Sequence, residues 1–193
     1  GLPQNNVSAL AADRNNGLWV GFNGHGIAHY DGSAWMHLNT DNSDLSDDKI
    51  RTLAVDMEGA VWIGTRTGLD HFDGTAWQFY DDSNSDLPSR VVNCIFIHEN
   101  GAKWIGTEGG LVHIDATGWT VYTTDNSDLP SNRVRSVMSD GNGALWIGTR
   151  GGGVAKIQGL TWSVYNSSNT DAPLDQTNSI YARRNGHVLA GTQ

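Results

Sequence analysis

The stretch that decides the fold occurs three times in nearly the same letters: AVWIGT at residues 60–65, AKWIGT at 102–107 and ALWIGT at 144–149. Two weaker copies flank them, GLWVGF at 17–22 and VLAGT at 188–192. The tryptophans of the four Trp-containing copies lie 43, 42 and 42 residues apart, and a second tryptophan follows each of them after fifteen or sixteen residues. The two sets are Trp19, Trp62, Trp104 and Trp146, and Trp35, Trp77, Trp119 and Trp162. The chain is therefore an internal repeat of about 42 residues.

Each repeat contains four short segments rich in β-forming residues, separated by turn residues and without helical periodicity. In the second repeat these segments cover residues 50–56, 60–65, 68–74 and 77–80, and a polar stretch at 81–90 leads into the next repeat. We predict a tight hairpin with a positive φ angle at the glycine after the first segment. These glycines are Gly17, Gly59, Gly101, Gly143 and Gly186.

A repeat of four strands and about 42 residues is typical of a β-propeller blade. We therefore predict an all-β propeller of four-stranded antiparallel blades, with the first strand of each blade innermost and the fourth outermost. The units cover about 2–44, 45–86, 87–128, 129–171 and a partial unit at 172–193, within a single propeller domain or propeller fragment at 1–193. Half of a fifth blade leaves three explanations open: a five-bladed ring with a thin last blade, a fragment of a larger propeller, or closure through another copy.

Composition excludes several classes of function. Twelve basic against 21 acidic residues give a formal charge of −9, which argues against a nucleic-acid partner. No apolar run approaches the ~20 residues of a membrane helix, so we expect no membrane contact by this segment. The lone Cys94 excludes an internal disulfide, and the Asp-rich connections lack the ligand spacing of an EF-hand. We predict no cofactor and no metal site.

The abundant aromatic and imidazole side chains have structural explanations. Tryptophan faces suit sugar stacking, but both Trp positions recur in every full repeat, which favours packing between blades. His29, His71 and His113 share one repeat position that holds Lys156 in the fourth unit. Since that position lies on the third strand of separate blades, these imidazoles cannot converge on one metal ion.

One known family is similar to this pattern. The segments LPSNRV at 129–134, DGNGALWIGTRGGG at 140–153 and WSVY at 162–165 resemble the two-component regulator propeller repeat. The resemblance covers nearly the whole chain, and it implies the periplasmic sensor region of a bacterial hybrid histidine kinase or a related secreted propeller. The third-strand histidines depart from the family pattern, which often has Arg or Lys there. The motif is structural and names no ligand.

The candidate ligand site consists of positions whose charge changes while their neighbours keep the repeat. One such position follows the Gly-Thr pair at the end of the second strand, and another lies near the start of the innermost strand. The candidates at the first position are Arg66, Glu108 and Arg150, together with His25 in the corresponding loop of the first repeat. The candidates at the second position are Arg51, Asn93 and Arg135. We predict that they form a polar surface near the propeller axis, and we assign no catalytic residue.

The function predicted from these observations is recognition without catalysis. We expect a periplasmic or extracellular ligand-sensing module of a bacterial two-component protein, with an oligosaccharide or another small ligand as partner. Protein binding, or self-association through the incomplete blade, is a further expectation. The alternatives are a stand-alone secreted propeller that binds glycan or protein, and an enzyme resembling propeller lyases.

Overall fold

The structure is a computed structural model that describes residues 2, 4–183 and 187–192. Its strands form four antiparallel sheets of four strands and one of two, here called blades 1 to 5. Blade 1 contains β1 (Val7–Ala12), β2 (Leu18–Phe22), β3 (Ile27–Tyr30) and β4 (Trp35–Leu38), and blade 2 contains β5 (Thr52–Val55), β6 (Val61–Gly64), β7 (Leu69–Phe72) and β8 (Trp77–Tyr80). Blade 3 contains β9 (Val92–Ile97), β10 (Lys103–Thr107), β11 (Leu111–Asp115) and β12 (Gly118–Tyr122). Blade 4 contains β13 (Val134–Ser139), β14 (Leu145–Thr149), β15 (Gly153–Gln158) and β16 (Thr161–Tyr165), and blade 5 contains β17 (Thr177–Ala182) and β18 (Val188–Thr192).

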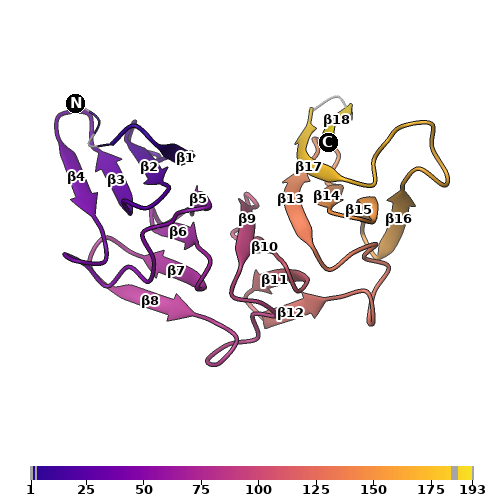
Figure 1. Cartoon of the computed structure of the whole chain (residues 1–193), viewed down its shortest axis with the longest axis horizontal. Helices are drawn as coiled ribbons and strands as arrows, with labels where there is room; N and C mark the ends of the chain where they lie inside the picture. Colours follow the sequence, from indigo (N-terminus) through magenta and orange to yellow (C-terminus); the bar gives the residue numbers. More distant parts are fainter. Residues whose placement is uncertain (1, 3, 184–186, 193) are drawn as a thin grey trace.

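The strands of each blade follow one another in chain order, and the blades stand side by side along an arc. Figure 1 shows the first strands β1, β5, β9, β13 and β17 along the inner side of the arc, with the fourth strands outside. The predicted all-β propeller of four-stranded antiparallel blades, four full and one half, is confirmed. The polar connection after each fourth strand brings the chain from the outside of one blade to the inside of the next.

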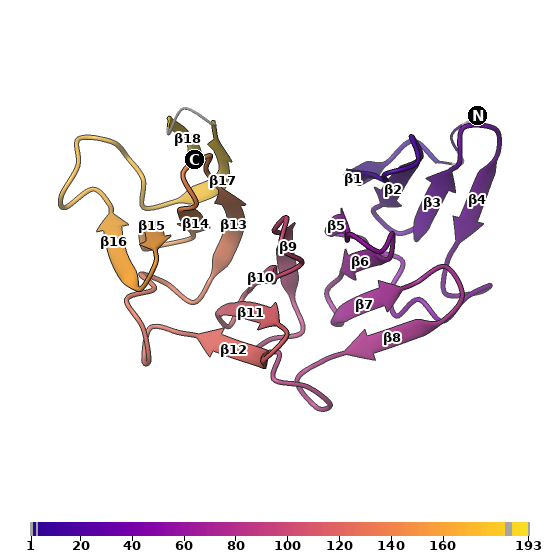
Figure 2. The ribbon, with the colours of Figure 1, turned by 180° about the vertical axis from the view of Figure 1, so that it is seen from behind.

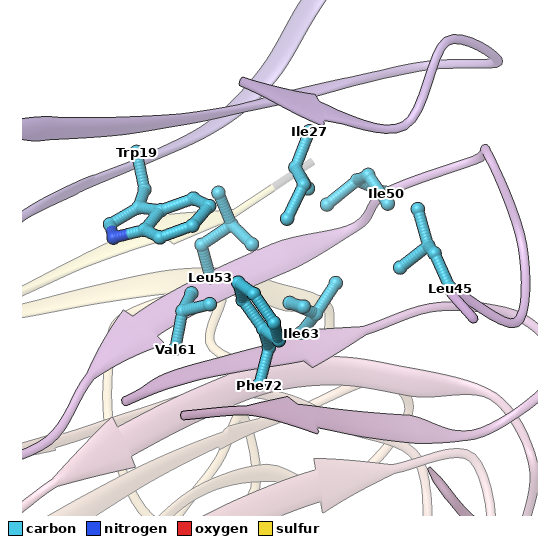
Figure 3. Packing of buried hydrophobic residues seen from close by; sticks show 8 residues of the cluster. All are labelled: Trp19, Ile27, Leu45, Ile50, Leu53, Val61, Ile63 and Phe72. Carbon is cyan, nitrogen blue, oxygen red and sulfur yellow. The ribbon is translucent and has the colours of Figure 1, made fainter. Parts of the chain in front are cut away.

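The core lies between blades rather than within one sheet. Figure 3 shows Trp19 and Ile27 of blade 1 facing Leu53, Ile63 and Phe72 of blade 2. The aliphatic side chains at the end of the polar connection, Leu45 and Ile50, complete the cluster. Equivalent clusters join blade 2 to blade 3 and blade 3 to blade 4. Trp19 and Trp62 are therefore buried core residues, and Trp104 packs against the cluster between blades 3 and 4.

The third-strand histidines complete this packing. The imidazoles of His29, His71 and His113 lie against the second-strand tryptophan of their own blade, with ring centroids 4.2 to 4.4 Å apart. In blade 4 the Nζ of Lys156 lies 5.3 Å from the centroid of the Trp146 ring, so a cation replaces the imidazole. These side chains lie on separate blades, as expected. Among the described residues no group of three His, Cys, Asp or Glu side chains is arranged to hold a metal ion.

In blades 1 to 4, a glycine near the end of the second strand sets how closely the next blade approaches. A Cβ placed on Gly64 would lie 2.6 Å from Cγ1 of Val92 on blade 3, and one on Gly106 would lie 2.6 Å from Cγ1 of Val134 on blade 4. A side chain there would hold the next inner strand away from the sheet. The WIGT motif is therefore a packing motif, in which tryptophan fills the space between blades and glycine permits the contact.

The predicted hairpin glycines are correct in blades 2 to 4 and wrong in blade 1. Gly59, Gly101 and Gly143 have φ angles of 91°, 85° and 78°. In blade 1 the positive φ, 61°, belongs to Asn16, and Gly17 occupies the position that alanine holds in the next three blades. Asparagine tolerates the left-handed region better than other residues with a Cβ. Gly186, in the corresponding turn of blade 5, lies outside the described residues.

The arc is open. Figures 1 and 2 show blade 1 and blade 5 at its two ends, separated by a gap. Leu10 of β1 is 61% exposed, whereas Leu53, at the same position of blade 2, is 7% exposed. On the other end blade, Tyr181 and Leu189 are more than half exposed. The explanation by a closed five-bladed ring is therefore wrong for this structure, because neither end face is covered. The described residues contain no helix long and apolar enough to cross a membrane.

Candidate functional site

The candidate site lies on one rim of the arc, the rim at which the inner strands begin. Because first and second strands are antiparallel, with Thr52 opposite Gly64 in blade 2, the start of an inner strand lies beside the loop that follows the second strand. This end of the blades is called here the inner rim. It contains both classes of position at which the sequence changes charge.

Four polar side chains from three blades form one hydrogen-bonded group, called here the inner-rim network. Its centre is Asn93 of β9. The Asn93 Oδ1 accepts a hydrogen bond from Nη2 of Arg51 at 2.6 Å and one from Nη1 of Arg135 at 3.3 Å. The Asn93 Nδ2 donates to Oε1 of Glu108 at 3.1 Å and to the carbonyl oxygen of Val134 at 2.8 Å. Each residue is separated from its counterpart on the next blade by one repeat, which explains how residues 42 apart meet.

Charge in the network is unevenly compensated. Glu108 forms an ion pair with Arg135, whose Nη2 lies 2.9 Å from Oε1 of Glu108. The other carboxylate oxygen, Oε2, lies 3.9 Å from Nε of Arg133. Burial, together with the nearby charges of Arg66 and Arg135, lowers the pKa of Arg51. The Nε atoms of Arg51 and Arg135 are buried without a hydrogen-bond partner in the described part of the chain. The network therefore carries more positive charge than its single carboxylate neutralises.

A cavity of about 280 Å³ opens beside Arg51, on the blade 1 side of the network. Its polar lining consists of cationic and neutral side chains without a carboxylate, and Ile50 is its apolar wall. The polar residues are Ser8, Asn23, Lys49, Arg51, Arg66 and Asn93. Such a lining provides donors for hydrogen bonds to a small polar ligand.

The structure brings together five of the seven predicted site residues: Arg51, Arg66, Asn93, Glu108 and Arg135. The other two stand apart from the network. Arg150 is exposed and takes part in hydrogen bonds through its backbone: its N–H donates to the carbonyl of Arg133, and its carbonyl accepts from the hydroxyl of Ser131. His25 is exposed, and its carbonyl oxygen interacts with the His37 ring.

The candidate list omitted Lys49, Asn23 and Ser8, which line the cavity. A signal for Lys49 is present in the sequence, since it ends the polar connection into blade 2 and is one residue from Ile50, at the start of the inner segment. Asn23 and Lys49 form an isolated β-bridge, which holds the two chain segments together at the cavity edge. Asn23 shares the repeat position of Arg66, Glu108 and Arg150, and Ser8 shares that of Arg51, Asn93 and Arg135. The repeat therefore contains a signal for both residues.

Blade 2 has a second unusual polar feature, a buried carboxylate. Asp70 of β7 is fully buried where the other three full blades have Ala or Val. Its oxygens accept hydrogen bonds from the Ser46 N–H at 3.1 Å and from the Ser46 hydroxyl at 2.6 Å. Burial raises the pKa of Asp70 to about 7, although the two Ser46 bonds oppose the rise. Ser46 stands where the next two connections have Pro88 and Pro130, which have no N–H to donate.

Comparison with known proteins identifies the repeats. The model of the two-component regulator propeller matches residues 1–24, 44–67 and 128–151. These three segments are similar to the two-component regulator propeller repeat. Each matched segment runs through the first and second strands of a blade and ends in the loop on the inner rim. The resemblance stated from the sequence is confirmed.

Solved structures show the same arrangement of blades. The extracellular domain of a protein described as a hybrid two-component system of B. thetaiotaomicron has a TM-score of 0.85 and 26% identity, over 96% of this chain and 26% of that chain. The extracellular domain of a second B. thetaiotaomicron protein, described as a one-component system, has a TM-score of 0.76 and 19% identity, over 100% and 29% of the two chains. The present chain thus spans about a quarter of the length of these two relatives.

A streptogramin B lyase has a TM-score of 0.70 at 16% identity, over 100% of this chain and 70% of that chain. At this identity the likeness to the lyase concerns the fold alone. No curated protein matches the chain.

Proposed function

We propose that the chain is a non-catalytic ligand-recognition module in the extracytoplasmic part of a bacterial two-component signalling protein. The observation that carries this proposal is the inner-rim network with its adjoining cavity. Polar side chains from three blades meet there on a rigid β scaffold, at positions where the repeat itself requires no charge. The likeness to extracellular domains of two-component systems supports the placement outside the cytoplasm.

Convergence of several blades on one group suits recognition that is linked to signalling. Arg51 belongs to blade 2, Asn93 and Glu108 to blade 3, and Arg135 to blade 4. A ligand that contacts the network therefore touches groups whose relative positions depend on how adjacent blades pack. Binding at such a place stabilises one packing of the blades, which is a means of passing the bound state to a connected segment.

The arrangement of charge favours binding over an enzyme of the lyase kind. A lyase requires a general base within reach of a substrate proton. Glu108, the carboxylate of the network, already accepts from Asn93 and forms an ion pair with Arg135. The likeness to streptogramin B lyase concerns the fold, and we propose no catalytic role for these residues.

A binding screen tests the proposed function. The 193-residue chain is screened against glycans and small molecules, with mass spectrometry of each ligand after incubation to detect turnover. We expect a ligand that binds without a change in its mass. We also expect the variant Arg51→Ala/Arg135→Ala to lose this binding. The matched control is Arg14→Ala, which removes one charge at an exposed β1–β2 turn, far along the strand from the inner rim.

Two outcomes contradict the proposal. Unchanged binding by a folded Arg51→Ala/Arg135→Ala variant removes the site from the function. Conversion of the ligand to a product replaces recognition with catalysis. The rest of the coding sequence of the gene distinguishes a sensor from a secreted binding protein. A sensor gene also encodes a membrane helix and a kinase domain, whereas the gene of a secreted binding protein encodes neither.

A further inference from the structure

Three cations line the inner-rim cavity: Lys49, Arg51 and Arg66. Arg90, Arg133 and Arg135 each lie within ion-pair distance of an acidic side chain. In the described part of the chain, Lys49, Arg51 and Arg66 have no such partner, and the cavity between them has no acid in its lining. This concentration of positive charge occurs in a chain with a formal charge of −9.

The position of Arg51 makes this charge costly without a ligand. Its guanidinium is partly buried, and the charges of Arg66 and Arg135 oppose its own charge more strongly than that of Glu108 favours it. Desolvation and like-charge repulsion both destabilise a cation, and attraction to a bound anion offsets both costs. The short hydrogen bond from Nη2 to Asn93 holds the Arg51 side chain in place, so part of the entropic cost of ordering it is already met in the free protein.

The cavity has the size and the donors that a charged group requires. Its volume of about 280 Å³ is close to the lower end, roughly 300 Å³, of the range for small-molecule pockets, so it fits one acidic group with its immediate substituents. Arginine binds planar or tetrahedral oxyanions through paired N–H donors, and lysine adds a compact charge. Ser8 and Asn23 add neutral donors at the cavity wall.

We infer that the cavity binds the oxyanion group of an acidic ligand, a carboxylate or a sulfate, between Lys49, Arg51 and Arg66. This inference rests on the proposed function and narrows its ligand to acidic molecules. The negative surface of the rest of the protein opposes the approach of polyanions in general. Recognition is therefore directed to an acidic group that can enter this cavity.

A matched pair of sugars tests the charge requirement. D-Glucuronate and D-glucose differ at one carbon, where the first has a carboxylate and the second a hydroxymethyl group, and inorganic sulfate tests the oxyanion without a sugar. Binding of each to the intact chain is measured by calorimetry and by chemical-shift changes. We expect glucuronate to bind at least tenfold more tightly than glucose, and its affinity to fall with rising salt concentration.

Charge removal locates the binding. Arg51→Gln and Arg66→Gln each remove one cation, and Arg66 is exposed, so its variant is expected to fold even if the Arg51 variant is impaired. We expect each folded variant to weaken glucuronate binding roughly 10- to 100-fold, the usual effect of losing one charge-assisted hydrogen bond. Arg14→Gln, which removes the same charge at a distant exposed turn, is expected to leave the affinity unchanged.

The outcomes separate this inference from the proposed function. Equal affinity for glucuronate and glucose, or glucuronate affinity unchanged by Arg51→Gln and Arg66→Gln, overturns the inference. Failure of both sulfate and glucuronate to bind the unmodified chain overturns it as well. If a neutral ligand binds the chain and Arg51→Ala/Arg135→Ala abolishes that binding, the inference of an acidic ligand is wrong but the proposed recognition function stands. Sulfate and glucuronate binding that both disappear in Arg66→Gln supports the inference.

Discussion

The clearest test of the blade packing is an alanine at two equivalent glycines, Gly64 in blade 2 and Gly191 in blade 5. A Cβ on Gly64 would lie 2.5 Å from Cγ2 of Thr52 and 2.6 Å from Cγ1 of Val92, with Cβ of Val92 at 3.1 Å. Because Val92 is fully buried and its Cβ is also close, rotation of its methyl groups does not clear the overlap. At Gly191 the one close atom is Oγ of Ser179 at 2.4 Å, and the next atom is 3.8 Å away.

The two substitutions should therefore change the free energy of unfolding differently: Gly64→Ala should lower it, and Gly191→Ala should leave it unchanged or raise it. Overpacking of a buried contact costs about 1–3 kcal/mol, and replacing glycine by alanine regains about 0.4–1 kcal/mol by restricting the unfolded chain. Gly64→Ala is expected to destabilise by about 1–2 kcal/mol, which lowers Tm by roughly 2–8 °C in a chain of this length. Gly191→Ala is expected to be neutral or to stabilise by up to about 1 kcal/mol, since the Ser179 hydroxyl can rotate away.

Thermal and urea unfolding followed by circular dichroism measure the difference. Stacked blades need not unfold as one unit, so hydrogen exchange of the β18 amides is measured alongside to detect separate opening of blade 5. Equal losses of stability in both variants would refute the reasoning, because they would mean that the glycine matters for the strand itself. A stable Gly64→Ala protein would refute the proposed contact between blades.

Three further predictions concern Asp70, Trp62 and Cys94. The folded-state pKa of Asp70, about 7, is above its ordinary value of 3.8, so its contribution to stability is complete below pH 4 and is lost as pH rises through 7. The difference in unfolding free energy between wild type and Asp70→Asn, measured in urea, should fall by on the order of 1 kcal/mol per pH unit between pH 4 and 7, and a pH-independent difference would contradict it. The indole N–H of Trp62 donates to Oδ2 of buried Asp56 at 2.9 Å, whereas Trp104 has no such hydrogen bond in the described part of the chain. Trp62→Phe should therefore lower the free energy of unfolding by about 1–3 kcal/mol more than Trp104→Phe in the same assay. Burial raises the pKa of Cys94 to about 12, so iodoacetamide at neutral pH should modify it at least about 100-fold faster in urea-unfolded than in native protein, and equal rates would show that the thiol is accessible.

Much of the fold was predictable because the same pattern of residues recurs in each repeat, so each copy supports the interpretation of the others. A single short segment such as AVWIGT does not distinguish a strand from a buried helical turn. Its recurrence every 42 residues, with a second tryptophan and a turn at constant offsets, identifies a four-stranded unit that must bury both faces against its neighbours. The error at Gly17 arose from alignment by residue type, since Asn16 and not a glycine occupies the left-handed position in blade 1.

The candidate site was predictable in part. Arg51, Asn93 and Arg135 share one repeat position, which places them on neighbouring inner strands, and the structure joins them through hydrogen bonds to Asn93. Arg150 satisfied the same rule as Arg66 and Glu108, yet it is exposed and outside the network. The repeat gives each residue its place on its own blade, but a side chain of that length can turn toward solvent or toward the next blade.

The amino-acid sequence by itself determined the length of a blade, the order of its strands and the identity of its core tryptophans. These properties depend on periodicity and on the local chemistry of turns, which are readable in one chain. The tertiary structure alone decided that the arc is open, that Ser46 hydrogen-bonds the buried Asp70, and that three cations surround a cavity without an acid. These features depend on the rotation between neighbouring blades and on side-chain conformations, which arise only when residues distant in sequence are packed together.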